Sequence, residues 1–206
     1  NSRINLSSNM TYEFAGGDLF RLNGVFKTGT RKFERTGSLF LPDNAGDLIF
    51  DVNTLRLEES KNPSWEIGGD YGSKWGENWT FKIIGLYANK ENDKEQQEDF
   101  DFEEGDFLED IRSFSTRHST EAISRVSLGW SGLENHNIEF GTEVSINTLV
   151  TDLEFFERVD GNLLETEIEN SALGVKEIRF ESFVNDTWKV GGKTTFETVI
   201  IAEYSE

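Results

Sequence analysis

The densest group of residues that could do chemistry is the acidic stretch "ENDKEQQEDFDFEEGDFLED" at positions 91–110. It holds 11 acidic residues against one lysine, a net charge of −10, which is over half of the −19 carried by the whole chain. Hard cations take oxygen ligands of this kind, so one hypothesis is a Ca²⁺ site. Its candidate ligands are Asp99, Asp101, Glu103, Glu104 and Asp106. The spacing does not match an EF-hand loop, and the alternative is a solvated acidic loop.

The sequence contains no catalytic constellation, and we expect no enzyme activity. There is no cysteine, and the two histidines, His118 and His136, have no Ser/His/Asp pattern around them. No glycine-rich phosphate loop occurs either, and apart from Ca²⁺ no cofactor is expected. The excess of acidic over basic residues, 39 against 20, argues against nucleic acid as a partner.

The elements that must position these residues are β-strands, because apolar residues recur at every second position along most of the chain. We count eight main strands in four hairpins, with no convincing helix and no apolar run long enough for a membrane helix. The predicted fold is all-β, an antiparallel up-and-down meander of about eight strands. Its short turns fall at 15–18, 74–78, 131–136 and 190–193, and its long connections at 30–63, 91–117 and about 150–175.

Alternation alone fits both a half-buried soluble sheet and a barrel whose apolar face meets lipid. Two observations favour part of a transmembrane β-barrel. Short and long connections alternate, and the predicted strands of about 10–12 residues suit a tilted span. Four tryptophans also gather near the short turns, as in an aromatic girdle at a bilayer interface. These are Trp75, Trp79, Trp130 and Trp188. The alternative is the aromatic end of a soluble sandwich core.

Charged residues on the polar side of the strands are the other candidates for binding. In a barrel they would face the lumen and contact water, substrate or a plug, and the alternative is a set of cross-strand ion pairs. They are Arg21, Lys27, Lys82, Arg125, Glu139, Glu143 and Arg179.

The stretch "FESFVNDTWKVGGKTTFE" at 180–197 resembles the barrel strands of TonB-dependent outer-membrane receptors. In that family a strand often ends with an aromatic residue and Asp-x-Trp before a short turn, and here Phe183, Asp186 and Trp188 fill the pattern. "SSNMTYEF" followed by "GGDLFRLNGVF" is similar to a hairpin of the same family. The strand after the turn departs from it, since "VIIAEYSE" stands where a Gly-Leu-Arg-Tyr-like strand is usual.

Both ends of the sequence are strand-like, so we expect 1–206 to be a barrel segment with both ends truncated and no signal peptide. The resemblance implies that this segment, which lacks a plug domain, comes from a barrel of 22 strands. It implies a receptor in the outer membrane of a Gram-negative bacterium that imports a scarce nutrient such as a siderophore, cobalamin or sugar. Partners would be outer-membrane lipid, a small nutrient ligand, the receptor's own plug domain and a TonB-type energy-coupling complex. The alternatives are a complete eight-stranded outer-membrane barrel and a soluble β-sandwich binding module.

Overall fold

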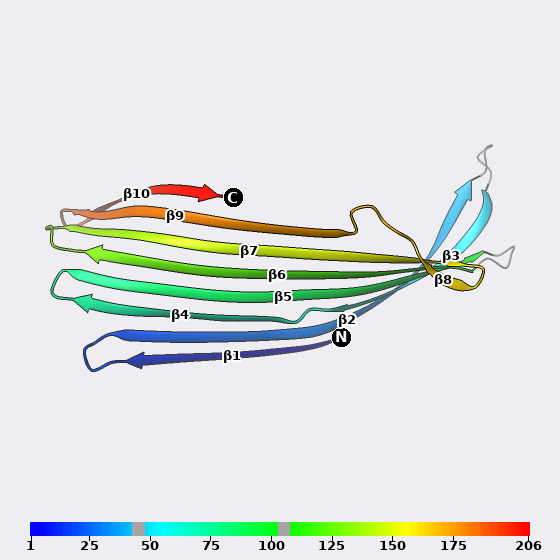
Figure 1. Cartoon of the computed structure of the whole chain (residues 1–206), viewed down its shortest axis with the longest axis horizontal. Helices are drawn as coiled ribbons and strands as arrows, with labels where there is room; N and C mark the ends of the chain where they lie inside the picture. Colours follow the sequence, from blue (N-terminus) through cyan, green and yellow to red (C-terminus); the bar gives the residue numbers. More distant parts are fainter. Residues whose placement is uncertain (43–47, 103–107) are drawn as a thin grey trace.

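The computed structural model describes residues 1–42, 48–102 and 108–206 as one antiparallel sheet of ten strands (Figure 1). The path across the sheet is β1-β2-β3-β5-β6-β7-β9-β10, with β4 paired to β2 and β5, and β8 paired to β7. The prediction of an all-β antiparallel meander with about eight strands is confirmed. The strands are β1 Ser2–Glu13, β2 Leu19–Pro42, β3 Leu48–Lys61, β4 Ser64–Trp75, β5 Trp79–Phe102, β6 Leu108–Trp130, β7 His136–Val159, β8 Asn162–Glu165, β9 Ala172–Val190 and β10 Thr194–Ser205.

Four strands are far longer than predicted. β2, β5 and β7 have 24 residues each and β6 has 23, which corresponds to roughly 80 Å of extended chain. The prediction of long connections at 30–63 and 91–117 is therefore wrong, because most of these residues continue the strands. The apolar alternation weakens there because charged and polar residues interrupt it, yet the backbone pairing continues.

β3 and β4 occupy one position in the sheet, end to end, and are separated by Asn62 and Pro63. β4 pairs with the first part of β2 and β3 with the second part. The Asn62 amide donates to the Gly29 carbonyl at 3.1 Å, and the Pro63 carbonyl accepts from the Glu91 amide at 2.9 Å. Proline has no N–H, so the ladder loses one hydrogen bond at this row.

The long connection predicted at about 150–175 is in its first part a hairpin. β7 continues to Val159, and β8 returns along it. Asp160 and Gly161 form the turn with φ of 51° and 78°, the two positive values that a type I′ turn requires.

The half of the sheet nearest the short turns has one apolar and one polar face. Cross-strand register keeps the apolar residues of every strand on the same side, which we call the apolar face. No second layer covers it in the described residues, so these side chains are exposed, for example Ile67 at 46% and Phe140 at 42%. The apolar face includes Leu6, Leu22, Phe26, Ile67, Tyr71, Ile83, Val126, Phe140, Val144, Phe180, Val184 and Ile200.

The apolar face has a limited height along the strands. On β5 it runs from Trp79 to Tyr87 and on β7 from Ile138 to Ile146, nine residues in each case. Beyond Tyr87 the same face carries Asn89. The apolar face is therefore a band across the sheet. Beyond it β5 is largely polar, whereas β7 mixes polar residues with apolar ones such as Val150 and Phe156. No helix long and apolar enough to cross a membrane occurs in the described part of the chain.

The short-turn ends of the strands are staggered in one direction across the sheet. The row that contains Leu19, where β2 starts, runs through Phe183 on β9, five strands away. β9 ends at Val190, seven residues beyond that row. The turns are thus displaced along the strands by seven residues of about 3.3 Å each, over a distance across the sheet of five strand spacings of about 4.8 Å each. The two lengths are nearly equal, so the strands are tilted by roughly 45° from the normal to the line of turns.

The polar face is tightly packed at one point. Phe183 is the one large apolar side chain that is buried among those described, at 6% exposure, and it lies on the polar face against Gly141. A Cβ at position 141 would overlap the Phe183 ring and lie 3.0 Å from the Val126 carbonyl oxygen. The Phe183 ring therefore fills the space that a side chain at position 141 would occupy.

We predict that Gly141→Ala lowers the free energy of unfolding by about 1–3 kcal/mol, because the new methyl group displaces the Phe183 ring. Gly85→Ala is the matched control, since a Cβ there meets nothing within 4 Å. Equilibrium denaturation of the intact protein measures both. Adding Phe183→Ala to Gly141→Ala should cost less than the sum of the single changes, and full additivity would contradict the packing described here.

Candidate functional site

The four predicted tryptophans lie at the short-turn end of the apolar face. Trp79 contacts Trp130 on the neighbouring strand with ring centroids 6.1 Å apart, and Trp75 stacks on Phe81 at 5.3 Å. Trp188 contacts Phe196 at 5.9 Å. The structure thus brings the four residues to one edge of one face.

His136 occupies a defined place between the two residues of the Asp-x-Trp pattern. Its Nδ1 atom lies 2.9 Å from Asp186 Oδ2, and its ring stacks on Trp188 at 5.4 Å with an interplanar angle of 8°. Asp186 and Trp188 are two residues apart, so they share a face and can hold the imidazole together. The pattern has a structural role here, in joining the β6–β7 turn to β9.

A second aromatic group, missed in the sequence, lies at the opposite edge of the apolar face. Trp65 and Tyr87 are neighbours on β4 and β5, with centroids 5.2 Å apart, and Phe26 pairs with Trp65 from β2. The sequence contains a signal for this group, since Trp65 opens one alternating apolar run and Tyr87 closes the next, and polar residues adjoin both. Aromatic side chains therefore border the apolar band at both of its edges in this part of the sheet.

The predicted lumen charges lie on the polar face, and several of them form ion pairs. Arg21 binds Asp70 with Nη2 to Oδ2 at 2.8 Å. Glu143 lies between two arginines, 3.9 Å from Arg125 and 3.7 Å from Arg179. The Arg125 guanidinium also lies over the Phe183 ring, 4.2 Å from its centroid. For these residues the cross-strand ion pairs weighed as the alternative are present.

Lys82 and Glu139 have no ion pair in the described part of the chain. Lys27 lines a hollow in the polar face together with Arg3, Arg31 and Lys90.

The five candidate Ca²⁺ ligands are only partly described. Glu103, Glu104 and Asp106 lie outside the described residues, and Asp101 is placed only as a backbone position at the end of β5. Asp99 accepts hydrogen bonds from the Gln97 amide at 3.0 and 3.2 Å. Within residues 1–42, 48–102 and 108–206 no three His, Asp or Glu side chains are grouped to hold a metal ion. The Ca²⁺ site stays a prediction.

The outer half of the sheet contains a charged contact between β2 and β3. Lys32 Nζ lies 2.8 Å from Glu59 Oε2, while Lys61 Nζ lies 3.8 Å from Glu59 Oε1. The hydrogen bond from Lys32 lowers the pKa of Glu59 below its ordinary value of 4.5. At the short-turn end, the Tyr71 hydroxyl donates to Asp18 at 2.6 Å and lowers the pKa of Asp18.

Comparison with known proteins gives similarity to solved structures only. No family model matches the chain, and no curated protein matches its sequence. The copper transporter OprC is similar with a TM-score of 0.39 and 8% identity, over 98% of this chain and 36% of that one. The translocator domain of the autotransporter NalP from Neisseria meningitidis is similar with a TM-score of 0.35 and 11% identity, over 98% of this chain and 66% of that one.

The ferric yersiniabactin uptake receptor FyuA from Yersinia pestis is similar with a TM-score of 0.28 and 10% identity, over 93% of this chain and 46% of that one. This chain therefore spans about a third of the copper transporter and under half of the uptake receptor. At these low scores and identities the likeness assigns the chain to no family, and the proposals below are based on the geometry of the sheet.

We predict that Lys32→Gln raises the pKa of Glu59 towards 4.5, because the carboxylate loses its main hydrogen-bond donor. A depressed pKa means that the contact stabilises the β2–β3 hairpin above pH 4.5 and that this contribution is lost as the pH falls through the folded-state pKa. Carbon-detected NMR titration of labelled glutamate measures the change. Lys61→Gln is the control and should shift the pKa less. An equal shift in both variants would contradict the assignment of Lys32 as the principal partner.

Proposed function

We propose that this chain is part of the wall of an outer-membrane β-barrel of a Gram-negative bacterium, with its apolar face against lipid and its polar face towards the lumen. The observation that carries the proposal is the uncovered apolar band. It is nine residues high on β5 and β7, and a tilted membrane strand needs about 9–11. Such a band in water would be a large exposed apolar patch, whereas lipid would cover it.

Two further features support the same orientation. The stagger of the short turns corresponds to a strand tilt of roughly 45°, and membrane barrels have tilts of about 35–45°. Aromatic residues border the band at both edges, with Trp79 and Trp130 near the short turns and Trp65 with Tyr87 at the other side. The short turns would then face the periplasm, and the polar outer halves of the strands would project from the cell as paired hairpins.

The two edge strands favour a barrel larger than eight strands. Among the described residues β1 pairs only with β2, and β10 only with β9, so these eight strand positions do not close on themselves. An open strand edge leaves backbone N–H and C=O groups unpaired, which lipid does not tolerate. Further strands beside β1 and β10 would satisfy them.

Within this class, we propose a TonB-dependent receptor that imports a scarce nutrient. The support is the resemblance of 180–197 to that family and the structural use of its Asp-x-Trp pattern, in which Asp186 and Trp188 hold His136. The partners in this proposal are outer-membrane lipid, a small nutrient ligand, the receptor's plug domain and a TonB-type energy-coupling complex. The chain itself would supply wall and outer hairpins, with no enzymatic step.

We predict that Ile83→Arg weakens insertion of the intact protein into phospholipid vesicles. Ile83 lies midway between Trp79 and Tyr87 on the apolar face, and arginine at the bilayer midplane costs about 2–4 kcal/mol. Ile84→Arg is the matched control, because its side chain points to the polar face and should insert almost normally. The midpoint of a urea titration of folding into vesicles reports the difference. Equal losses in both variants would overturn the assignment of faces.

A second prediction concerns the depth of the aromatic edge. In a variant that keeps Trp79 and has phenylalanine at the other four tryptophans, lipids brominated along the acyl chain should quench the Trp79 fluorescence. The reason is that the indole lies at the lipid-facing edge of the band. A single-tryptophan variant at Leu153, on the polar face of the outer half of β7, is the unquenched control. A folded protein whose Trp79 is not quenched would contradict the membrane proposal.

A further inference from the structure

The polar face carries a belt of cations just beyond the apolar band. Three successive rows of the sheet cross this region, two residues apart along each strand. The first row contains Lys27, Ser64, Lys90 and Ser119. In the second row Arg3 pairs with Gly29, and Asn92 pairs with Arg117. The third row contains Arg31, Ser60, Lys94 and Ser115. We call the six cations the basic belt: Arg3, Lys27, Arg31, Lys90, Lys94 and Arg117.

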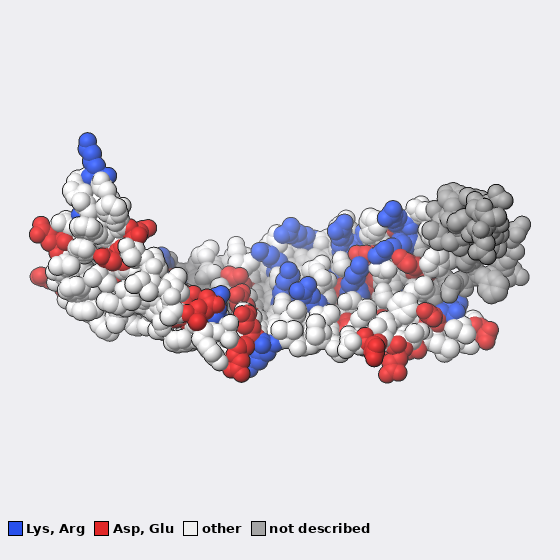
Figure 2. All heavy atoms as spheres, turned by 90° about the horizontal axis from the view of Figure 1, so that it is seen from above, with Lys and Arg blue, Asp and Glu red and all other residues white. Residues whose placement is uncertain are grey.

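No acidic residue lies in these three rows, although the chain has 39 acidic residues. The nearest acids on the same face lie in the rows on either side, for example Glu66 and Glu58. Lys94 reaches Glu58 at 3.1 Å, but in the described part of the chain the other five cations have no ion pair. Figure 2 shows Lys and Arg gathered beyond the middle of the sheet, whereas Asp and Glu predominate at the short-turn end.

The acidic residues of the same segment lie on the opposite face. Along β5, Lys90, Asn92 and Lys94 point to the polar face. Glu91, Asp93 and Glu95 alternate with them and point away. The sheet therefore separates the charge of this segment, so the belt is a positive surface despite the negative charge of the whole chain.

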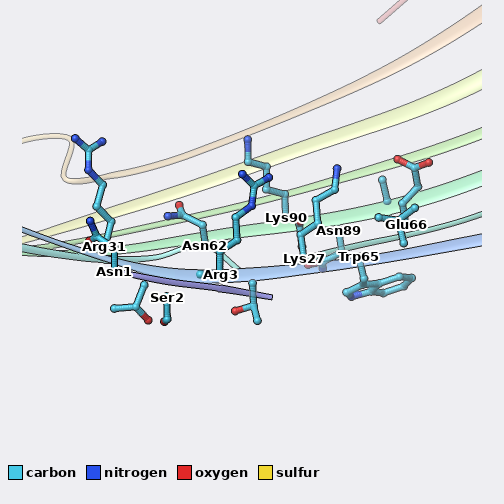
Figure 3. A pocket seen from close by; sticks show the side chains of 16 residues that line it. Asn1, Ser2, Arg3, Lys27, Arg31, Asn62, Trp65, Glu66, Asn89 and Lys90 are labelled. Atoms are coloured by element: carbon cyan, nitrogen blue, oxygen red, sulfur yellow. The ribbon is translucent and has the colours of Figure 1, made fainter. Parts of the chain in front are cut away.

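The belt lines a concave surface. A hollow of about 730 Å³ is lined by Arg3, Lys27, Arg31 and Lys90, and in Figure 3 these four side chains rise from one side of the sheet while Trp65 points to the other. A second hollow of about 490 Å³ adjoins it, shares Lys90 and includes Arg117. Glu66 lines the first hollow and Glu121 and Glu177 line the second, all in the row next to the belt on the side of the short turns. Between the cations stand small residues, Ser64, Gly29 and Ser119, which leave room above the sheet.

We propose that the basic belt binds a solute that carries several phosphate or carboxylate groups. The belt cations are diagonal neighbours, since Arg3 lies diagonally to Lys27 and Arg31, and Arg117 to Lys90 and Lys94, within reach of long side chains. The ion pairs that neutralise Arg21, Arg125 and Arg179 are absent from five of them. An anionic ligand would supply the missing charge. The inference rests on the proposed function only for the route by which the solute arrives, which is the lumen of the barrel.

The dimensions of the belt favour a polyanion over a single small ion. Lys27 and Lys90 are two strand spacings apart, about 10 Å, and the three rows cover about 13 Å along the strands. A single phosphate would reach only some of the cations. A chain of phosphates, or a molecule with three carboxylates, could engage Lys27, Lys90 and Arg3 together, and arginine binds such groups in a bidentate manner.

The test is isothermal titration calorimetry of the intact protein with tripolyphosphate, citrate and, as an uncharged control, raffinose. The belt variant is Lys27→Gln/Lys90→Gln. The matched control is Lys74→Gln/Lys82→Gln, which removes the same charge from the polar face of β4 and β5 nearer the short turns. We expect the belt variant to bind the preferred anion at least about tenfold more weakly, because it loses two charge-assisted contacts. The control should bind like the wild type, and binding should weaken with added salt.

The comparison of the two anions tells phosphate from carboxylate recognition. Equal affinity of the belt and control variants, equal binding of raffinose, or no binding to the wild type would each overturn the proposal. Vesicle insertion of the same samples, measured as for Ile83→Arg, keeps the two proposals apart. A protein that inserts but binds no anion refutes the belt alone, whereas one that binds the anion without inserting refutes the membrane proposal and leaves the belt supported.

Discussion

The continuous antiparallel register from β2 to β9 is the constraint on which the other features depend. Side chains alternate between the faces of a strand, so a slip of one residue would move the apolar residues of that strand to the polar face. The register keeps Phe140 between Leu128 and Val184, and through such rows the apolar band stays unbroken. The Phe183 ring fits only beside Gly141, so side-chain packing also opposes a shift in register, in addition to the backbone hydrogen bonds.

The inner half of the fold could be predicted from the sequence because each strand there has one apolar and one polar side. The outer half could not, since Lys90, Glu91 and Asn92 are polar on both sides and leave no hydrophobic alternation. Polar runs are usually loops, and here they are strands because β3, β5, β6 and β7 extend together and satisfy one another's backbone groups. The Asp-Gly turn after Val159 could be predicted, because its conformation depends on the local sequence.

The site follows the same division. The tryptophans near the short turns were recognisable because turn and indole are close in sequence. His136 between Asp186 and Trp188, and Lys27 beside Ser64 and Lys90, join residues from distant strands, and only the register reveals them. A charge count also hides the belt, because the acids of 91–95 cancel its lysines in sequence although they lie on the other side of the sheet.

Pro63 marks the row where the sheet position shared by β3 and β4 is interrupted, while β2 and β5 pass it without a break. The strands on either side of this row are held by full ladders, whereas at Pro63 one hydrogen bond towards Glu91 is missing. β3 and β4 have no ladder with each other, so β2 and β5 hold them in line. Lys27 and Lys90 lie on these two strands, and the spacing between them is therefore set by continuous β-structure on both sides of the break.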